Sequence, residues 1–281
     1  MTKTYLLTGA TGFVGHHVFQ RLCDQGARIR LVVRTGKAMD LAKLPNVESI
    51  VQTDDLFAES QRWWEQACEG IDTIIHIAWY VEPGKYLTAP ANLDCLAGTL
   101  VMAKAAAVAG VRRFVGIGTC FEYDLSKGAL STDTPLRPQM PYGAAKAASF
   151  LALNACLPAL SVEFSWCRIF FLYGEGEDSR RLVSHIRERL SKGQVAELTA
   201  GEQQRDYLDV KDAAQMIVDV VNSDVTGPVN ICSGFAPTVR ELAEKIADEY
   251  GRRDLLKFGA RAPNQVDPPC ILGIKSDANL K

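Results

Sequence analysis

Short apolar runs alternate with longer helical patterns along the chain up to position 169. The runs are rich in β-branched residues and have the length of buried strands, and Gly26 and Gly110 stand where helices commonly end. Such alternation is typical of a parallel sheet that is covered by helices on both faces. The predicted strands are Tyr5–Thr8, Ile29–Val33, Thr73–Ile77, Arg113–Ile117 and Val162–Ile169, and the predicted helices are Phe13–Gln25, Gln61–Cys68, Leu96–Ala109 and Tyr142–Leu157.

The alternation changes after position 173. We predict an α/β fold in which residues 1–173 form a Rossmann-type domain with a doubly wound parallel sheet. Residues 174–281 should form mainly a smaller C-terminal α/β lobe over the mouth of the sheet, with the chain crossing back to the sheet. The predicted elements of this part are the helices Leu182–Lys192, Lys211–Val221 and Thr238–Tyr250 and the extended segment Val229–Ile231.

Length, composition and charge exclude several classes of protein. The 281 residues are 47% hydrophobic and 23% charged, which suits one large domain or a main domain with a smaller lobe. A formal net charge of -2 gives no reason to expect a nucleic-acid partner. The apolar run Tyr5–Leu7 is too short for a signal-peptide core, and no apolar stretch approaches a membrane-spanning length. Residues 276–281 resemble the start of an element, which leaves a further C-terminal segment open.

Cysteine and histidine positions bear on the compartment and on metals. Eight cysteines are dispersed along the chain without a C-x-x-C motif, which predicts reduced, mostly buried thiols and a cytoplasmic protein. The four histidines do not pair with cysteines at zinc-ligand spacing. We therefore expect no metal site.

The stretch TGATGFVG at positions 8–15 lies between the first predicted strand and the first predicted helix. Glycines at such a junction allow a tight turn, close approach of the backbone to a pyrophosphate and close helix–sheet packing. The helix N-terminus adds amide donors and a positive dipole, so we predict a dinucleotide-binding loop rather than a simple glycine turn. His76, at the end of the fourth strand, should be a packed histidine and not a catalyst. The candidate cofactor residues are Gly9, Thr11, Gly12, Phe13 and Val14 in the loop, Asp55 and Leu56 after a third strand region that directly precedes them, and Ile77 and Ala78 at the end of the fourth strand, Thr73–Ile77.

The end of the second predicted strand bears on the choice of dinucleotide. An acidic residue there binds the ribose hydroxyl of NAD, whereas an arginine accommodates the additional phosphate of NADP. The sequence carries Arg34, followed by Thr35 and Lys37, and no carboxylate where one is expected. NADP(H) is therefore the predicted cofactor. NAD(H), with Arg34 as a solvated loop residue, stays open as the alternative.

Tyr142 and Lys146 stand four positions apart in the alanine-rich stretch MPYGAAKAAS at positions 140–149. Residues i and i+4 share one face of a helix, so both side chains should point into the same space. The alternative is a surface helix with an incidental tyrosine and a solvated lysine. The spacing by itself does not decide between the two interpretations.

Several motifs occur together and in order along the chain. They are TGATGFVG at 8–15, HIA at 76–78, YGAAK at 142–146, RIFFLYG at 168–174 and GEQQRDYLDVKD at 201–212. This combination resembles the extended short-chain dehydrogenase/reductase family over nearly the whole chain. The resemblance implies a Rossmann domain with a C-terminal lobe that holds a nucleotide sugar. It also implies a homodimer with a four-helix interface built from Leu96–Ala109 and Tyr142–Leu157.

The resemblance assigns catalytic roles to three residues. Tyr142 would exchange a proton with the substrate oxygen. Lys146 would hydrogen-bond the nicotinamide ribose and also lower the pKa of the phenol, because a nearby ammonium group favours the phenolate. Thr119, in the Ser/Thr position of the family at the end of the preceding strand, would bind the same substrate oxygen. Hydride transfer between a nicotinamide and a ketone carbon is the expected chemistry.

The residues that follow Thr119 limit which reaction of the family this chain is expected to catalyse. Family members that dehydrate hexoses carry Asp-Glu directly after this Ser/Thr, whereas this chain carries Cys-Phe. Glu122 comes one position later, and on a strand that shift turns the side chain to the opposite face. Epimerases of the family usually carry asparagines where this chain has Cys95 and Phe171. These departures favour a reductase, and GTCFEY at 118–123 together with WYVEPGKYL at 79–87 resembles nucleotide-linked 4-keto-6-deoxyhexose reductases. The resemblance implies NAD(P)H-dependent reduction of a keto group on a nucleotide-linked 4-keto-6-deoxy sugar. Two alternatives stay open, namely a 4-epimerase with bound NAD and a non-catalytic NADP(H)-binding sensor.

Substrate phosphates need cationic partners. Arg205 matches the diphosphate-binding arginine of the family, although a surface pair with Asp206 or Asp209 is the alternative. Trp79 would line the sugar pocket or join the core, and Cys120 would lie in the pocket or be a buried thiol. The candidate substrate residues are Trp79, Thr119, Cys120, Phe171, Arg205 and Arg261.

Overall fold

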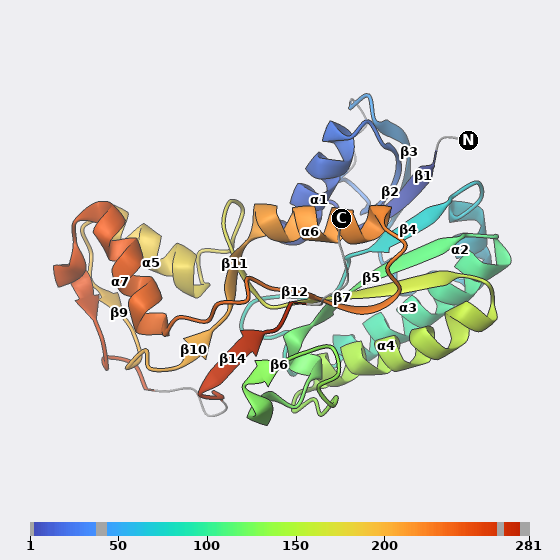
Figure 1. Cartoon of the computed structure of the whole chain (residues 1–281). Coiled ribbons are helices and arrows are strands. Elements are labelled where there is room, and N and C mark those ends of the chain that lie inside the picture. Colours follow the sequence, from blue (N-terminus) through green and yellow to red (C-terminus); the bar gives the residue numbers. More distant parts are fainter. Residues whose placement is uncertain (1–2, 38–43, 263–266, 276–281) are drawn as a thin grey trace.

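The computed structural model of the chain describes residues 3–37, 44–262 and 267–275, so the predicted start of an element at 276–281 lies outside the described residues. A seven-stranded sheet forms the centre of the molecule, in the spatial order β12-β7-β5-β4-β1-β2-β3 (Figure 1). All neighbouring strands in it are parallel. The strands are β1 (Thr4–Thr8), β2 (Arg28–Arg34), β3 (Val47–Thr53), β4 (Thr73–His76), β5 (Arg113–Thr119), β7 (Glu163–Ile169) and β12 (Gly227–Ile231).

The order of the strands changes direction between β1 and β4. From β1 the chain adds β2 and β3 on one side, and it then adds β4, β5, β7 and β12 on the other. Ligands of open parallel sheets bind at the carboxyl ends of the strands beside such a switch point. The loops that follow β1 and β4 therefore frame the candidate site. The predicted α/β fold with a doubly wound, Rossmann-type parallel sheet is confirmed.

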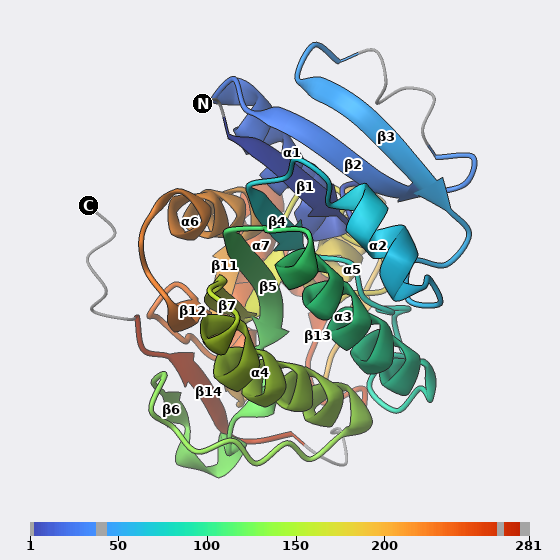
Figure 2. The ribbon, with the colours of Figure 1, turned by 90° about the vertical axis from the view of Figure 1, so that its right-hand side faces the viewer.

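Helices cover both faces of the sheet, and each face buries its own cluster of apolar side chains (Figure 2). Strands that are apolar on both sides are stable only in such a sandwich. By length and composition α3 could cross a membrane, contrary to the expectation from the sequence, but it packs against α2 and α4 as a core helix does. The helices are α1 (Phe13–Asp24) and α6 (Val210–Asn222) on one face, and α2 (Gln61–Ala67), α3 (Ala91–Val108) and α4 (Pro141–Ala159) on the other.

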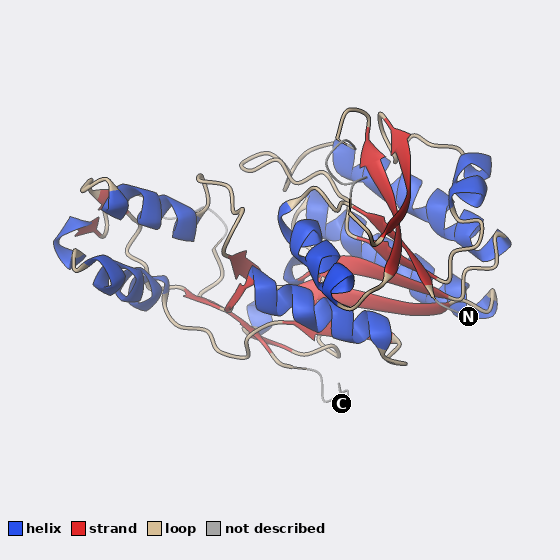
Figure 3. Ribbon diagram, turned by 90° about the horizontal axis from the view of Figure 1, so that it is seen from above, coloured by secondary structure: helices blue, strands red, loops and turns tan. Residues whose placement is uncertain are grey.

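The chain beyond β7 builds a smaller lobe and also returns to the sheet. The packed pair of α5 and α7 projects away from the central sheet, whereas α6 and β12 rejoin it (Figures 1 and 3). Three short parallel sheets connect these parts, with the orders β10-β14-β6, β11-β8 and β13-β9. The elements are β6 (Ala129–Leu130), β8 (Phe171–Tyr173), α5 (Leu182–Ser191), β9 (Ala196–Glu197), β10 (Gln204–Arg205), β11 (Tyr207–Asp209), α7 (Val239–Tyr250), β13 (Leu256–Lys257) and β14 (Cys270–Gly273), with 3-10 turns at η2 (Cys120–Glu122), η3 (Leu125–Lys127) and η4 (Arg253–Leu255).

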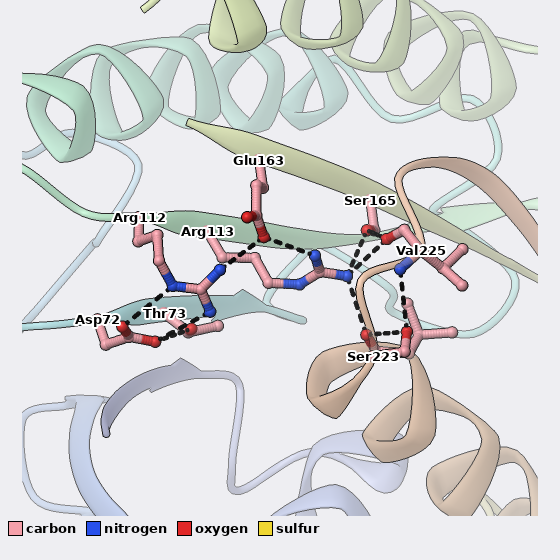
Figure 4. A network of polar contacts seen from close by, with 9 residues as sticks. Asp72, Thr73, Arg112, Arg113, Glu163, Ser165, Ser223 and Val225 are labelled. Carbon is pink, nitrogen blue, oxygen red and sulfur yellow. Dashed lines mark hydrogen bonds and ion pairs between the residues drawn. The ribbon is translucent and has the colours of Figure 1, made fainter. Parts of the chain in front are cut away.

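A buried arginine ties the amino ends of β5 and β7 to the end of α6 (Figure 4). The guanidinium of Arg113 donates to Glu163 Oε2 at 3.0 Å and to Ser165 Oγ at 2.9 Å. It also donates to the carbonyl oxygens of Val220 at 3.0 Å and Val225 at 2.6 Å. These bonds engage both terminal nitrogens of the guanidinium, whereas the buried Nε makes no hydrogen bond, and a buried charge is tolerated when it is paired and hydrogen-bonded in this way. These contacts lie at the opposite end of the strands from the candidate site, so they serve the fold.

Candidate active site

A glycine turn joins β1 to α1 at the edge of the site. The N–H of Gly12 donates to the carbonyl oxygen of Gly9 at 2.9 Å, and Gly9 has a φ of 78°, which favours glycine. A Cβ atom on Gly15 would lie 2.0 Å from the oxygen of Gly9. A Cβ atom on Gly9 would lie 2.7 Å from the backbone nitrogen of Ala78. The turn therefore needs glycine at these positions.

The N-terminus of α1 presents its amide groups beside this turn. The helix is capped by Gly12, which makes no side-chain hydrogen bond, so the amides of Phe13 and Val14 keep their donors for a ligand. A pyrophosphate suits such a helix end because it accepts amide hydrogen bonds and is favoured by the helix dipole. The predicted residues Gly9, Thr11, Gly12, Phe13 and Val14 come together here and would hold the diphosphate of a dinucleotide.

His76 holds the end of β4 against β1. The hydroxyl oxygen of Thr8 accepts the N–H groups of Ile77 and Ala78, both at 3.2 Å, so its own hydrogen is directed to Nδ1 of His76 at 2.9 Å. The other ring nitrogen, Nε2, lies 3.0 Å from Thr99 Oγ1. Burial lowers the pKa of His76 to about 3, so the imidazole is neutral. His76 is a packed histidine, as the sequence predicts, and it fixes the backbone of Ile77 and Ala78 next to the glycine turn.

Arg34 and Asp55 lie at the carboxyl ends of two adjacent strands. Arg34 is exposed at the end of β2 and is paired in register with Thr53 of β3. Asp55 is exposed after β3, where its Oδ1 accepts the N–H of Phe57 at 2.9 Å, and Leu56 packs against the cluster under α2 and α3. The edge beyond β2 holds the adenosine half of a dinucleotide in Rossmann folds. The position of these residues fits that half of the cofactor.

Thr119, Tyr142 and Lys146 meet at the carboxyl end of β5. Thr119 ends the strand, and α4 carries Tyr142 and Lys146 on one face. The side chain of Thr119 is near enough to Tyr142 to act on the pKa of its phenol, and Nζ of Lys146 donates to the carbonyl oxygen of Ile117 at 2.6 Å. The three side chains are 4%, 7% and 2% exposed, respectively, so the group is screened from bulk water.

Burial dominates the protonation of this group. It raises the pKa of Tyr142 above its ordinary value, with Tyr86 and Glu122 acting in the same direction and the hydrogen bond from Thr119 opposing them. Burial also lowers the pKa of Lys146 to about 7, although the charge of Glu122 opposes that shift. The expected lowering of the phenol pKa by Lys146 is therefore wrong for this structure. The reason is that desolvation of the phenolate is the largest effect on this pKa, and Lys146 is not among the main groups that shift it.

A buried ion pair lies directly beneath Thr119. Glu122 Oε1 accepts the backbone N–H of Thr119 at 2.8 Å and the indole N–H of Trp166 at 2.9 Å. Glu122 Oε2 accepts from Nε of Arg168 at 2.7 Å, and both side chains of the pair are at most 1% exposed. Glu122 does not lie on a strand, contrary to the expectation from the sequence, because β5 ends at Thr119 and a 3-10 turn follows. This turn directs the carboxylate inward, where it supports Thr119.

A cavity of about 720 Å³ opens beside the catalytic group, between the sheet and the lobe. Three of the predicted substrate residues, Phe171, Arg205 and Arg261, line it. Arg205 forms an ion pair with Asp267 and donates to the carbonyl oxygen of Gln204 at 2.7 Å, so neither Asp206 nor Asp209 is its ion-pair partner. Other residues of the lining are Leu87, Phe121, Gln139, Met140, Arg180, Leu182, His185, Glu197, Leu198, Thr199, Gln203, Tyr207 and Val239.

Two predicted substrate residues lie outside the described lining of the cavity. The ring of Trp79 lies over Lys146, with Nζ 3.8 Å from the ring centroid. Cys120 is 2% exposed in an apolar cluster with Phe170 and Cys232, and burial raises the pKa of its thiol to about 12. Neither side chain is among the residues that line the cavity, and the substrate contacts of Trp79 and Cys120 stay predictions. Both residues pack next to catalytic residues.

The structure adds residues that were not among the site residues predicted from the sequence. The backbone of Thr119 is held by Glu122, which is paired with Arg168. Asn92 holds Trp79 next to Lys146. Arg180 and His185 line the cavity. Arg180 and His185 follow the RIFFLYG motif closely, which is the one sequence signal that points to them. In the described part of the chain, no cluster of His, Cys, Asp and Glu could hold a metal ion. All eight cysteines lie in that part, and all are free thiols.

Comparisons with known proteins agree with this geometry. Residues 5–232 match the model of the NAD dependent epimerase/dehydratase family. The chain is 24% identical over 278 residues to dTDP-6-deoxy-L-talose 4-dehydrogenase (NAD(+)) of Aggregatibacter actinomycetemcomitans, and the match covers 96% of this chain and 99% of that relative.

Solved structures are similar over almost the full length. The UDP-N-acetylglucosamine 4-epimerase from Methanobrevibacter ruminantium M1, in complex with UDP-N-acetylmuramic acid, has a TM-score of 0.86 at 19% identity, with 98% of this chain and 90% of that chain covered. MoeE5 in complex with UDP-glucose and NAD has a TM-score of 0.77 at 26% identity, with 98% and 90% covered. Because the family model spans most of the chain and the fold agrees with it, this protein belongs to the NAD-dependent epimerase/dehydratase family.

Proposed function

We propose that this protein catalyses the NAD(P)H-dependent reduction of a keto group on a nucleotide-linked 4-keto-6-deoxy sugar. The observation that carries the proposal is the meeting of Thr119, Tyr142 and Lys146 at the carboxyl end of β5, beside both the glycine turn and the cavity. A hydroxyl, a phenol and an ammonium group in one water-poor site suit hydride transfer to a ketone that is coupled to proton transfer.

The protonation of the site supports the reductive direction. A raised pKa keeps Tyr142 protonated at neutral pH, so it can deliver its proton to the oxygen of the substrate as negative charge develops there. Thr119 would donate a hydrogen bond to the same oxygen and hold it in place. Lys146 would stabilise the developing charge and locate the ribose of the cofactor. The reduced nicotinamide supplies the hydride when it is bound.

The cavity supports a nucleotide-linked substrate. Arg205 is 5% exposed and Arg261 shares the same cavity, so a diphosphate would find two guanidinium groups in a partly desolvated site. The relative from Aggregatibacter is named for a dTDP-linked 6-deoxy sugar and for oxidation at its 4-position. The aromatic side chain of Phe171, where epimerases of the family usually carry asparagine, favours reduction over epimerisation.

We propose NADPH as the preferred cofactor because Arg34 ends β2 with an exposed guanidinium where an NAD-specific carboxylate would lie. The ratio of kcat/KM values for NADPH and NADH tests this proposal. Arg34→Asp should reverse the preference. A wild-type preference for NADH would overturn it.

We also propose a homodimer. Helices α3 and α4 carry large exposed apolar side chains, with Leu93 69%, Val108 64% and Leu151 59% exposed. A second copy that packs on these two helices would remove such side chains from water. Light scattering should give the mass of two chains, and a monomer at assay concentrations would contradict the proposal.

Nucleotide-linked 4-keto-6-deoxy sugars, offered with each reduced cofactor, test the reaction. Reduction consumes one reduced nicotinamide for each keto sugar and yields an alcohol. A 4-epimerase with bound NAD would instead interconvert two alcohols without net consumption of cofactor. A sensor would bind cofactor and convert neither substrate class, so each alternative has its own outcome.

A further inference from the structure

The segment between β4 and α3 contacts both catalytic side chains of α4. Near its start, Trp79 lies over Lys146 with Nζ 3.8 Å from the centroid of the indole. Further along, the ring of Tyr86 packs edge-on against that of Tyr142, with centroids 4.9 Å apart and planes at 85°. The carbonyl oxygen of Leu87 accepts the backbone N–H of Tyr142 at 3.1 Å. One loop thus touches the lysine, the tyrosine and the first turn of their helix.

Asn92 fixes the conformation of this loop. Its Oδ1 accepts the indole N–H of Trp79 at 2.9 Å, and its Nδ2 donates to the carbonyl oxygens of Tyr86 at 2.6 Å and Ala89 at 2.9 Å. The indole only donates and carbonyls only accept, so the amide has a single orientation that satisfies all three partners. Asn92 is 1% exposed, and a buried, fully satisfied amide is rigid. Trp79 is therefore held in place and not merely in contact.

The ammonium of Lys146 has few other partners among the described residues. One N–H donates to Ile117 at 2.6 Å, and the ring of Trp166 lies 5.6 Å away. The ionisable groups that act on it are Glu122 in η2, Cys95 in α3, and His76 at the end of β4. His76 is neutral, so Glu122 is the charged neighbour, and the face of Trp79 is the nearest π surface. A desolvated cation over an indole face is stabilised more than one at an exposed site.

We propose that Trp79 is a positioning residue for Lys146: its indole, anchored by Asn92, keeps the ammonium charged and directed within the catalytic group. The kinetic consequence rests on the proposed function, whereas the contact itself does not. Without the ring, the ammonium would lose favourable electrostatic contact in a site that offers no water in exchange. Lys146 would then deprotonate at lower pH, and a neutral amine cannot stabilise the charge that develops on the substrate oxygen.

The contact is tested first without any substrate. In an NMR spectrum of the ¹⁵N-labelled cofactor-free protein, Trp79→Phe identifies the Trp79 indole N–H resonance by its loss. We expect that resonance to move with pH in the wild type as Lys146 titrates, and to stop moving in Lys146→Met. A resonance that does not titrate, or that titrates equally in Lys146→Met, overturns the proposal. Because no turnover is involved, this outcome is independent of the proposed reaction.

The kinetic consequence is tested with a graded pair of variants. The pH dependence of kcat/KM for the cofactor reports groups of the free enzyme, and its alkaline limb should follow Lys146. We expect Trp79→Leu to move that limb to lower pH by about one unit, and Trp79→Phe to move it less, because a ring remains. Trp63→Phe, on α2 and remote from the lysine, is the matched control and should leave the limb unchanged. If Trp79→Leu does not shift the alkaline limb, Trp79 has only a packing role and the proposal is wrong.

Discussion

Glu122 offers the sharpest test of how the catalytic end of β5 is held. Its carboxylate accepts from Thr119 at 2.8 Å, from Trp166 at 2.9 Å and from Arg168 at 2.7 Å. Glu122→Gln preserves the shape of the side chain and removes its charge. Three N–H groups donate to this carboxylate, so the NH2 group of the new amide would face at least one of them without an acceptor. Arg168 would also lose its counter-charge, and its Nη2 already has no hydrogen-bond partner.

The magnitude follows from the burial of the pair. The side chains are 1% exposed for Arg168 and 0% exposed for Glu122, so water cannot replace the lost partner. Breaking a buried pair by removing one member costs about 3–5 kcal/mol, because an uncompensated charge stays buried. We expect Glu122→Gln to lower the free energy of unfolding by that amount. The contribution of a surface pair is smaller, about 1 kcal/mol or less.

Urea unfolding of a double-mutant cycle measures the effect. Glu122→Gln, Arg168→Met and the double variant are compared with the wild type, and the double variant should lose less stability than the sum of the singles. Glu48→Gln is the matched control, because its partner Arg28 is 51% exposed. A loss below about 1 kcal/mol in Glu122→Gln, or strict additivity in the cycle, would refute the reasoning.

Four further predictions concern the cofactor turn, the cavity and, in two of them, the lysine. Gly15→Ala would place a Cβ atom 2.0 Å from the oxygen of Gly9, so we expect loss of cofactor binding by calorimetry, and wild-type affinity would contradict the assignment of the turn. Arg205→Ala should raise KM for the nucleotide sugar by more than about tenfold, since a charge-assisted contact is lost, and an unchanged KM would place the diphosphate elsewhere. With a pKa of about 7, Lys146 is charged below that pH and neutral above it, so kcat/KM for the cofactor should fall as pH rises through 7. Folding depends on the same group in the opposite sense. The unfolded lysine keeps its proton up to its ordinary pKa of 10.5, so this group makes the fold more stable as pH rises from about 7 toward 10.5. In calorimetric melting the wild type should gain stability relative to Lys146→Met over this range, and a constant or falling difference would contradict the prediction.

Much of the sheet and the cofactor turn could be predicted because local patterns encode them. The run before TGATGFVG gives β1, and the glycines that follow have steric reasons that operate over a few residues. The first and last residues of the elements are encoded less clearly in the sequence. Helix α3 begins at Ala91 and not at the predicted Leu96, because Pro90 adopts helical dihedral angles and Asn92 is buried, neither of which apolar periodicity reveals. The strands β6, β9, β10 and β13 have two residues each and are too short to produce a pattern.

The members of the catalytic group could be predicted from the sequence, but the residues that hold them in place could not. The spacing of Tyr142 and Lys146 survives in α4, because a helix preserves it. Glu122 meets partners 44 and 46 positions away, and Trp79 meets Lys146 across the sheet edge, so only the tertiary fold creates these contacts. The protonation of Tyr142 could not be predicted from the sequence either, because burial, which only the tertiary fold creates, is the largest effect on its pKa.

The central claim is that Tyr142 delivers a proton while a reduced nicotinamide reduces a ketone. The most direct measurement is the amount of reduced cofactor consumed in a single turnover with a nucleotide-linked 4-keto-6-deoxy sugar, for the wild type and for Tyr142→Phe. We predict one cofactor oxidised per sugar in the wild type. In Tyr142→Phe the rate should fall by about a hundredfold or more, with unchanged cofactor affinity. Oxidation by Tyr142→Phe at the wild-type rate would contradict the account.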